Sequence, residues 1–169
     1  MRSSRLVLVS FVGGLAIAGT GAAQAPPDGT VHWTTTLSAT GAPGNGSEAT
    51  LELSGAIEDG WHVYALTQPP GGPAALRVTV DDNEIARAVG APSGPSPQKR
   101  RDPSFGLETR FYTHSFTIRL PVQIKQPATA AQQLIPVSVR FQTCSDRECQ
   151  PPTTVHLSVA VGPTSQGAT

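Results

Sequence analysis

The chain contains the stretch VSVRFQTCSDRECQPPTTVHLSVAV at residues 137–161, and this stretch indicates the class of fold. Apolar side chains occupy every second position from Val137 to Phe141 and again from Val155 to Val161. Alternation with a period of two is typical of β-strands. Two such runs around a short polar connection predict a β-hairpin.

The connection of this hairpin holds both cysteines of the chain, Cys144 and Cys149, with four polar residues between them. Because the cysteines lie at the two mouths of the loop, they can face each other across the strand pair. Directly opposed residues of an antiparallel pair are about 4.5–5.5 Å apart, which is within the range that a disulfide spans. We therefore expect a Cys144–Cys149 disulfide at the end of the hairpin.

Two roles are open for this disulfide, a structural link or a pair that is oxidised and reduced in exchange reactions. Closing a loop of about six residues stabilises a fold by only about 2 kcal/mol through chain entropy, so a large structural role is not an obvious reason for it. Asp146 and Glu148 outnumber Arg147 in the loop, and no helix N-terminus is predicted nearby, so neither cysteine is expected to be an activated thiolate. If the pair cycles, a more reactive thiol of a partner protein attacks it.

The first 23 residues are predicted to be a secretory signal peptide. Arg2 and Arg5 precede an apolar run from Leu6 to Ala18, and small residues follow up to the expected cleavage after Ala23. No second apolar run approaches the roughly 20 residues needed to cross a bilayer. We therefore expect a mature chain that is exported to the periplasm and is not inserted in the membrane. Disulfides persist in this oxidising compartment.

The rest of the chain is expected to be one domain over residues 31–162, between a flexible N-terminal segment (24–30) and a disordered tail (163–169). The full chain has 17 glycines and 16 prolines, which in this domain separate short strand-like segments, and no segment has a sustained helical period. About eight strands predict an all-β, immunoglobulin-like β-sandwich with the cysteine hairpin at one end. Besides the hairpin, strands are expected at 31–39, 49–57, 61–66, 76–80, 84–89 and 108–124, with a long loop at 90–105.

The charges and the histidines exclude several classes of function. The formal net charge is zero, which disfavours nucleic acid as a partner, and the run Lys99-Arg100-Arg101 is interpreted as part of a solvated loop. The four histidines are scattered, and a C-x4-C pair alone is a poor zinc signature, so we expect no metal site. No serine-nucleophile motif occurs. The chemistry expected of the cysteines needs no cofactor.

Two further segments are candidates for the site. Phe105 closes the long loop, within Asp102–Gly106, and it either anchors a turn or forms a lid over the disulfide. In the segment 59–64, alternation places Trp61 and Val63 on one face and His62 and Tyr64 on the other. One of these pairs is expected to pack in the core. The other pair either is half-buried with its polar atoms hydrogen-bonded or lies at the edge of the functional site.

These three segments together resemble the N-terminal periplasmic domain of the thiol:disulfide interchange protein DsbD. The resemblance lies in a D-G-aromatic-x-x-Y motif at 59–64, an Asp-x-x-Phe-Gly loop at 102–106 and an aromatic-Q-x-C-x4-C-x-P-P hairpin at 141–152. It extends over about 31–161, and the cysteine hairpin is its most specific part.

The resemblance implies an immunoglobulin-like fold with a redox-active disulfide. The family's domain receives reducing equivalents from a membrane-embedded thiol donor and passes them to periplasmic thioredoxin-fold proteins, including cytochrome c maturation factors. By this resemblance Cys144 and Cys149 are the redox pair, with Cys149 forming the mixed disulfide. Asp102, Phe105 and Gly106 then belong to the cap loop over the disulfide.

His62 and Tyr64 match positions near the disulfide, and His62 stands where the family has a tyrosine. Two departures from the family pattern accompany this match. The cap has one aromatic residue where the best-known version has two adjacent ones, and the sequence carries no membrane segments or thioredoxin-like domain after residue 162. We therefore expect either that the electron donor is a separate protein or that the chain is a stand-alone relative with a different partner. The alternative to an exchange protein is a non-catalytic immunoglobulin-like binding or assembly module whose disulfide is structural.

Overall fold

The computed structural model describes residues 29–39, 46–125 and 133–161. The predicted signal peptide, residues 24–28 of the predicted flexible segment and the predicted tail lie outside the described residues. Within the described ranges, no helix is long and apolar enough to cross a membrane.

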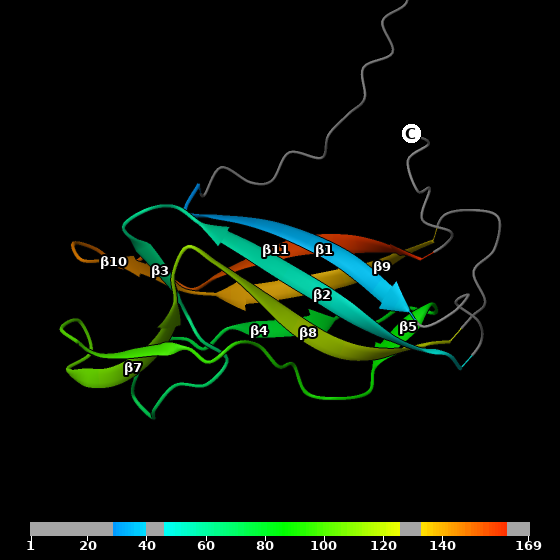
Figure 1. The fold of residues 1–169 in the computed structure, drawn as a ribbon, viewed down its shortest axis with the longest axis horizontal. Coiled ribbons are helices and arrows are strands. Elements are labelled where there is room, and N and C mark those ends of the chain that lie inside the picture. The colour runs from blue at the N-terminus through cyan, green and yellow to red at the C-terminus, as the bar shows by residue number, and fades with distance from the viewer. Residues whose placement is uncertain (1–28, 40–45, 126–132, 162–169) are drawn as a thin grey trace, which may run out of the picture.

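The described residues form eleven β-strands in three antiparallel sheets (Figure 1). The orders of the strands are β1-β2-β8-β5 in the first sheet, β10-β3-β7-β6 in the second and β11-β9-β4 in the third. The strands are β1 (Val31–Ala39), β2 (Glu48–Ile57), β3 (Trp61–Tyr64), β4 (Arg77–Val80), β5 (Ala86–Ala88), β6 (Gln98–Asp102), β7 (Leu107–Tyr112), β8 (Ser115–Ile124), β9 (Gln133–Phe141), β10 (Thr143–Ser145) and β11 (Thr153–Val161).

The core lies between the first and third sheets, which Figure 1 shows as β1, β2 and β8 crossing in front of β9, β11 and β4. Alternating apolar residues of the facing strands form one buried cluster. In register, Leu51 of β2 lies opposite Leu120 of β8, and Val139 of β9 lies opposite Val155 of β11. All four side chains are buried, so the predicted all-β, immunoglobulin-like β-sandwich is confirmed.

The predicted hairpin is the β9–β11 pair, which runs in register from Phe141↔Thr153 to Gln133↔Val161. The cysteines, however, do not lie on this strand pair. After Phe141 the chain forms β10, which pairs with β3 of the second sheet, and Cys144 faces His62 in that register. The residues 143–150, called here the cysteine hairpin, therefore extend from one sheet and complete another.

Two of the predicted segments are wrong, one strand and one loop. The run 108–124 is two strands, β7 and β8, in different sheets, and the chain turns between them at His114, whose φ is 60°. The polar run Thr113-His114-Ser115 interrupts the alternation at this turn, and it was the available signal for dividing the segment. The predicted loop 90–105 contains β6 (QKRRD), and the run Lys99-Arg100-Arg101 belongs to this strand instead of a loop. Its first four residues are exposed, so it lacks the apolar alternation that predicts a strand.

The second sheet lies at one end of the sandwich, at the left of Figure 1, and has two different faces. Val63 and Tyr112, which are register partners, face the main core, where the Tyr112 ring stacks on Phe116 with centroids 4.5 Å apart. Tyr64 and Phe111, the next pair in register, are buried on the opposite face together with Cys144. The alternation predicted for 61–64 is confirmed, and the face that carries His62 and Tyr64 is the one that carries the disulfide.

Candidate redox site

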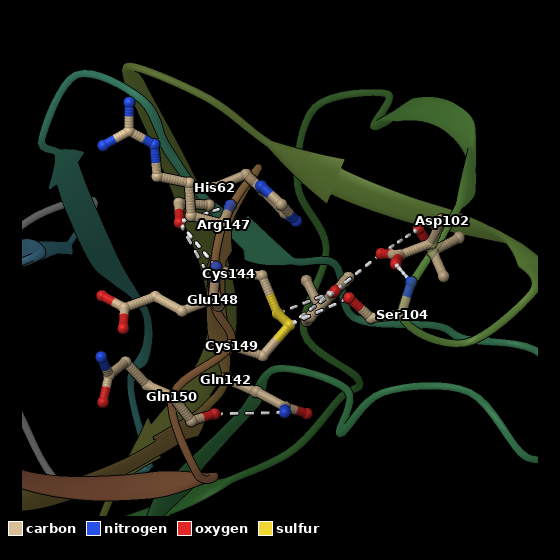
Figure 2. Close-up of a disulfide and its surroundings, with 12 residues drawn as sticks. His62, Asp102, Ser104, Gln142, Cys144, Arg147, Glu148, Cys149 and Gln150 are labelled. Carbon is tan, nitrogen blue, oxygen red and sulfur yellow. Dashed lines mark hydrogen bonds between the residues drawn. A yellow bond between two sulfur atoms is a disulfide. The ribbon is translucent and has the colours of Figure 1, made fainter.

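Cys144 and Cys149 form a disulfide within the cysteine hairpin, with their Cα atoms 4.0 Å apart. Backbone hydrogen bonds close the hairpin on both sides of the cysteine pair. The Ser145 N–H donates to the Glu148 carbonyl at 2.8 Å, and the Gln150 N–H donates to the Thr143 carbonyl at 2.9 Å. Figure 2 shows that Glu148 points away from the sulfur atoms, so its carboxylate does not border the face of the disulfide that meets the cap loop.

The two sulfur-bearing residues differ in exposure. Cys144 is only 1% exposed and lies in a buried cluster with Tyr64 and Phe111, whereas Cys149 is partly exposed at the edge of this cluster. A disulfide is broken by a thiolate that attacks one of its two sulfurs from outside. The geometry therefore favours attack at Cys149, with Cys144 as the leaving group.

A buried phenol contacts the leaving-group sulfur. The Tyr64 hydroxyl lies 3.0 Å from Cys144 Sγ and 4.0 Å from Cys149 Sγ, and it donates a hydrogen bond to Asp102 Oδ2 at 2.7 Å. Burial and the bond to Asp102 both raise the pKa of Tyr64 above its usual value, so the phenol keeps its proton. The phenol has one proton, so it can stabilise negative charge on Cys144 by hydrogen bonding when its O–H turns from Asp102 to the sulfur.

Asp102 ends β6 and is 3% exposed, and three donors surround its carboxylate. Besides the Tyr64 hydroxyl, these are the Ser104 N–H, 2.9 Å from Oδ1, and the Thr109 hydroxyl, 3.4 Å from Oδ2. Hydrogen bonds of this kind compensate the loss of water around a buried carboxylate. Asp102 is the first residue of the cap loop (residues 102–106), so its hydrogen bond to Tyr64 joins this loop to the phenol beneath the disulfide.

The cap loop closes on itself and lies against the disulfide. The Gly106 N–H donates to the Asp102 carbonyl at 2.8 Å, and Gly106 has a φ of 67°, a left-handed conformation that favours glycine. Phe105 is half-buried, and its ring meets the Tyr64 ring edge-on with centroids 5.9 Å apart. The Ser104 hydroxyl is 3.7 Å from Cys149 Sγ, on the side of the disulfide opposite the hairpin loop in Figure 2.

His62 is buried beside the disulfide without contacting either sulfur. Its ring lies between Tyr64 and Phe111, with centroid distances of 5.1 and 5.0 Å. Burial first, and then the neighbouring Arg100 guanidinium, lower the pKa of His62 to about 4, so the ring is neutral at neutral pH. Its Nε2 atom is buried and has no hydrogen-bond partner among the described residues.

Two residues of the site were not among the predicted ones. Gln142 is buried, accepts a hydrogen bond from the Ala74 N–H at 2.9 Å and donates one to the Gln150 carbonyl at 3.2 Å, as Figure 2 shows for the second bond. It thereby holds the end of the cysteine hairpin, and its place beside Cys144 in the motif was the available signal. Arg100 reaches the site from β6, and nothing in its run of three basic residues distinguishes it.

The family described as thiol:disulfide interchange protein DsbD, N-terminal, matches residues 34–160 of this sequence, a range that includes both cysteines, the cap loop and Tyr64. The chain belongs to the DsbD N-terminal family. A comparison with curated protein sequences found no match.

Solved structures share the fold of this DsbD N-terminal family member at low sequence identity. The reduced DsbD N-terminal domain of Neisseria meningitidis is 16% identical with a TM-score of 0.50, covering 80% of this chain and 89% of that one. The N-terminal periplasmic domain of ScsB from Proteus mirabilis is 18% identical with a TM-score of 0.53, covering 82% of this chain and 49% of that one. A complex of the DsbD and PilB N-terminal domains from Neisseria meningitidis matches at 16% identity, a TM-score of 0.47 and coverages of 81% and 88%.

Membership of the family, together with the disulfide, supports thiol:disulfide exchange as the activity of this domain. The site has the parts that such chemistry needs: an accessible sulfur, a buried leaving group and a hydrogen-bond donor beside that leaving group.

Proposed function

We propose that this chain is an exported thiol:disulfide exchange protein that passes reducing equivalents between partner proteins through Cys144 and Cys149. The observation that carries the proposal is the asymmetry of the disulfide. Cys149 is partly exposed beside the cap loop, and the buried Cys144 Sγ lies 3.0 Å from the Tyr64 hydroxyl. A structural link has no need of a proton donor against one of its sulfurs.

The first step is attack by the thiolate of a reduced partner on Cys149 Sγ. A disulfide forms between the partner and Cys149, the Cys144–Cys149 bond breaks, and its electron pair leaves on Cys144 Sγ. The Tyr64 O–H turns from Asp102 to the resulting thiolate and stabilises it by hydrogen bonding, and the thiolate then takes up a proton from solvent.

In the second step a second thiol of the partner attacks the partner's own sulfur in the mixed disulfide. This releases Cys149 as a thiolate and leaves the partner oxidised and this domain as a dithiol, so two electrons and two protons have been transferred. The reverse sequence reduces a disulfide in the next partner. The two cysteines carry both electrons, and the reaction as written requires no cofactor.

Access to Cys149 is controlled in this proposal by the cap loop. Ser104 and Phe105 lie on the side from which a partner reaches the sulfur, and the loop is short and exposed except for the buried Asp102 and the half-buried Phe105. Docking of a partner displaces this ring, as in other lid movements that admit a substrate. A closed cap protects the disulfide from small thiols that are not its partners.

The partners that we propose are those of the family: a membrane-embedded thiol donor and periplasmic thioredoxin-fold acceptors. The family match and the periplasmic origin of the ScsB domain, which shares this fold, support a periplasmic location.

Single-cysteine variants test the proposal directly. Cys144→Ser leaves the accessible Cys149 thiol. Its thiolate should displace thionitrobenzoate from a thioredoxin-fold protein that lacks its resolving cysteine and carries its remaining cysteine as a thionitrobenzoate mixed disulfide, which gives a disulfide between the two proteins. Cys149→Ser is the matched control, because it leaves only the buried Cys144 and should form little adduct. Equal adduct formation by the two variants, measured by mass spectrometry, would overturn the assigned roles.

The reduction potential of the wild-type disulfide separates exchange from a structural role. We expect reversible equilibration with glutathione or dithiothreitol at a potential above about −300 mV, below which structural disulfides lie. A more negative potential would leave only the binding or assembly module, and a Cys144→Ser, Cys149→Ser double variant would then keep full function.

A further inference from the structure

A second connection joins the strand of the cap loop to the cysteine hairpin, and it runs through Arg100. Arg100 precedes Asp102 by two residues in β6, so both side chains lie on the same face of the sheet. The guanidinium carbon lies 4.9 Å from the centroid of the Phe111 ring, and Nη2 is 3.5 Å from His62 Nδ1. Beyond these rings, Nη1 reaches Asp146 Oδ1 at 3.4 Å.

The contacts of this side chain extend from β6 towards the cysteine hairpin. The side chain begins on β6, passes over β7 at Phe111 and β3 at His62, and ends at the loop between the two cysteines. Asp146 itself is 87% exposed, so the ion pair is the contact that ties its side chain to the sheet. Two residues of β6, here called the cap strand, therefore connect it to the surroundings of the disulfide. Arg100 does so at the surface, through Asp146, and Asp102 does so in the interior, through Tyr64.

The neighbouring basic residues have a different geometry. Lys99 and Arg101 project from the other face of β6, because side chains alternate along a strand. Arg101 lies opposite Glu108 in the β6–β7 register. Of the three consecutive basic residues, Arg100 is thus the one whose side chain reaches the cysteine hairpin.

We propose that Arg100 is a positioning residue for the exchange reaction, and this inference rests on the proposed function. Its ion pair with Asp146 holds the tip of the cysteine hairpin against the cap strand and restricts the exposure of Cys149 in the oxidised protein. In the mixed disulfide the covalent link across the hairpin is absent. The ion pair and the backbone bonds of Ser145 and Gln150 then keep the hairpin closed, with Cys144 near Cys149.

The test compares rates of reduction by dithiothreitol at low ionic strength in Arg100→Gln and Arg101→Gln. Both variants lose one positive charge from β6, and this loss alone slows attack by an anionic thiolate. Loss of the ion pair acts in the opposite direction, because it frees the hairpin. We expect Arg100→Gln to be reduced about two- to five-fold faster than Arg101→Gln, the size of effect typical of a partly exposed ion pair. Equal rates in the two variants would overturn the proposal.

A double-mutant cycle with Asp146→Asn identifies the ion pair as the cause. In the Asp146→Asn background, Arg100→Gln should have no accelerating effect, and Arg100→Lys, which keeps the charge, should retain most of the slow wild-type rate. An acceleration of the same size with and without Asp146 would also overturn the proposal.

Thermal unfolding of each variant shows that it is folded. If the wild-type disulfide resists dithiothreitol altogether, the proposed function fails, whereas a reducible disulfide with no effect of Arg100 refutes only the positioning role.

Discussion

Asp102 and Tyr64 are 38 positions apart in the sequence, and their side chains share a 2.7 Å hydrogen bond in the interior beneath the disulfide. The same phenol oxygen is 3.0 Å from Cys144 Sγ. One buried hydroxyl therefore links the first residue of the cap loop with the sulfur that leaves when Cys149 is attacked. The predictions below concern this link and the residues around it.

Tyr64→Phe is expected to slow reduction of the disulfide by dithiothreitol about ten-fold or more. The Cys144 thiolate would then form without the hydrogen bond of the phenol, and a hydrogen bond to a charged group contributes about 1.5–3 kcal/mol. Tyr112→Phe is the matched control, because Tyr112 is buried on the opposite face of the same sheet and its hydroxyl contacts Pro95. Equal stopped-flow rates for the two variants would exclude a role of the Tyr64 hydroxyl in the reaction.

Phe105→Ala is expected to make the disulfide react several-fold faster with small thiols, since it removes the ring that lies against Tyr64 at the edge of the site. Glutathione and dithiothreitol rates should both increase. Leu134→Ala, which removes an apolar side chain that is 53% exposed in β9, should leave them unchanged. A rate that is unaffected by Phe105→Ala would mean that the ring shields nothing.

The stability of the protein is expected to depend on pH through His62. The pKa of His62 is about 4 in the folded protein, below the 6.5 of an unfolded chain, so the unfolded state binds the proton first as the pH falls. The free energy of unfolding should thus be highest above pH 6.5 and decrease towards pH 4, with a contribution from this group on the order of 2–3 kcal/mol.

Urea unfolding at several pH values measures this dependence. The wild type should lose more stability between pH 6.5 and pH 4 than His62→Phe, in which the titrating ring is absent. His156→Gln serves as the control, because His156 is exposed on the third sheet. Parallel curves for the wild type and His62→Phe would show that His62 is not the group responsible.

Gln142→Ala is expected to destabilise the fold by about 1–2 kcal/mol, because the buried Gln142 amide and its two part-buried hydrogen bonds, to the Gln150 carbonyl and the Ala74 N–H, are lost. Chemical denaturation measures this loss. Gln123→Ala removes an amide that contacts Arg87 near the surface and should have a smaller effect. Equal effects of the two substitutions would argue against a special role for Gln142 at the end of the cysteine hairpin.

Much of the sandwich can be predicted from the sequence, because the alternation of apolar residues is a local property of each strand. The runs that end at Phe141 and Val161 pair as their period of two predicts, and the same rule separates Trp61 and Val63 from His62 and Tyr64. It fails for β6, whose first four residues are all exposed, and it did not separate β7 from β8, although the polar residues 113–115 interrupt the alternation there.

The sequence by itself determined the class of fold, the disulfide between its two cysteines and the residues that carry the family motifs. Only the tertiary structure decided that Cys144 is buried while Cys149 is partly exposed, that Tyr64 and Asp102 meet beneath the disulfide, and that Arg100 reaches Asp146. The physical reason is distance along the chain. Periodicity reports which face of a strand is apolar, whereas these contacts depend on the register between strands that are far apart in the sequence, such as the 80 positions between Tyr64 and Cys144.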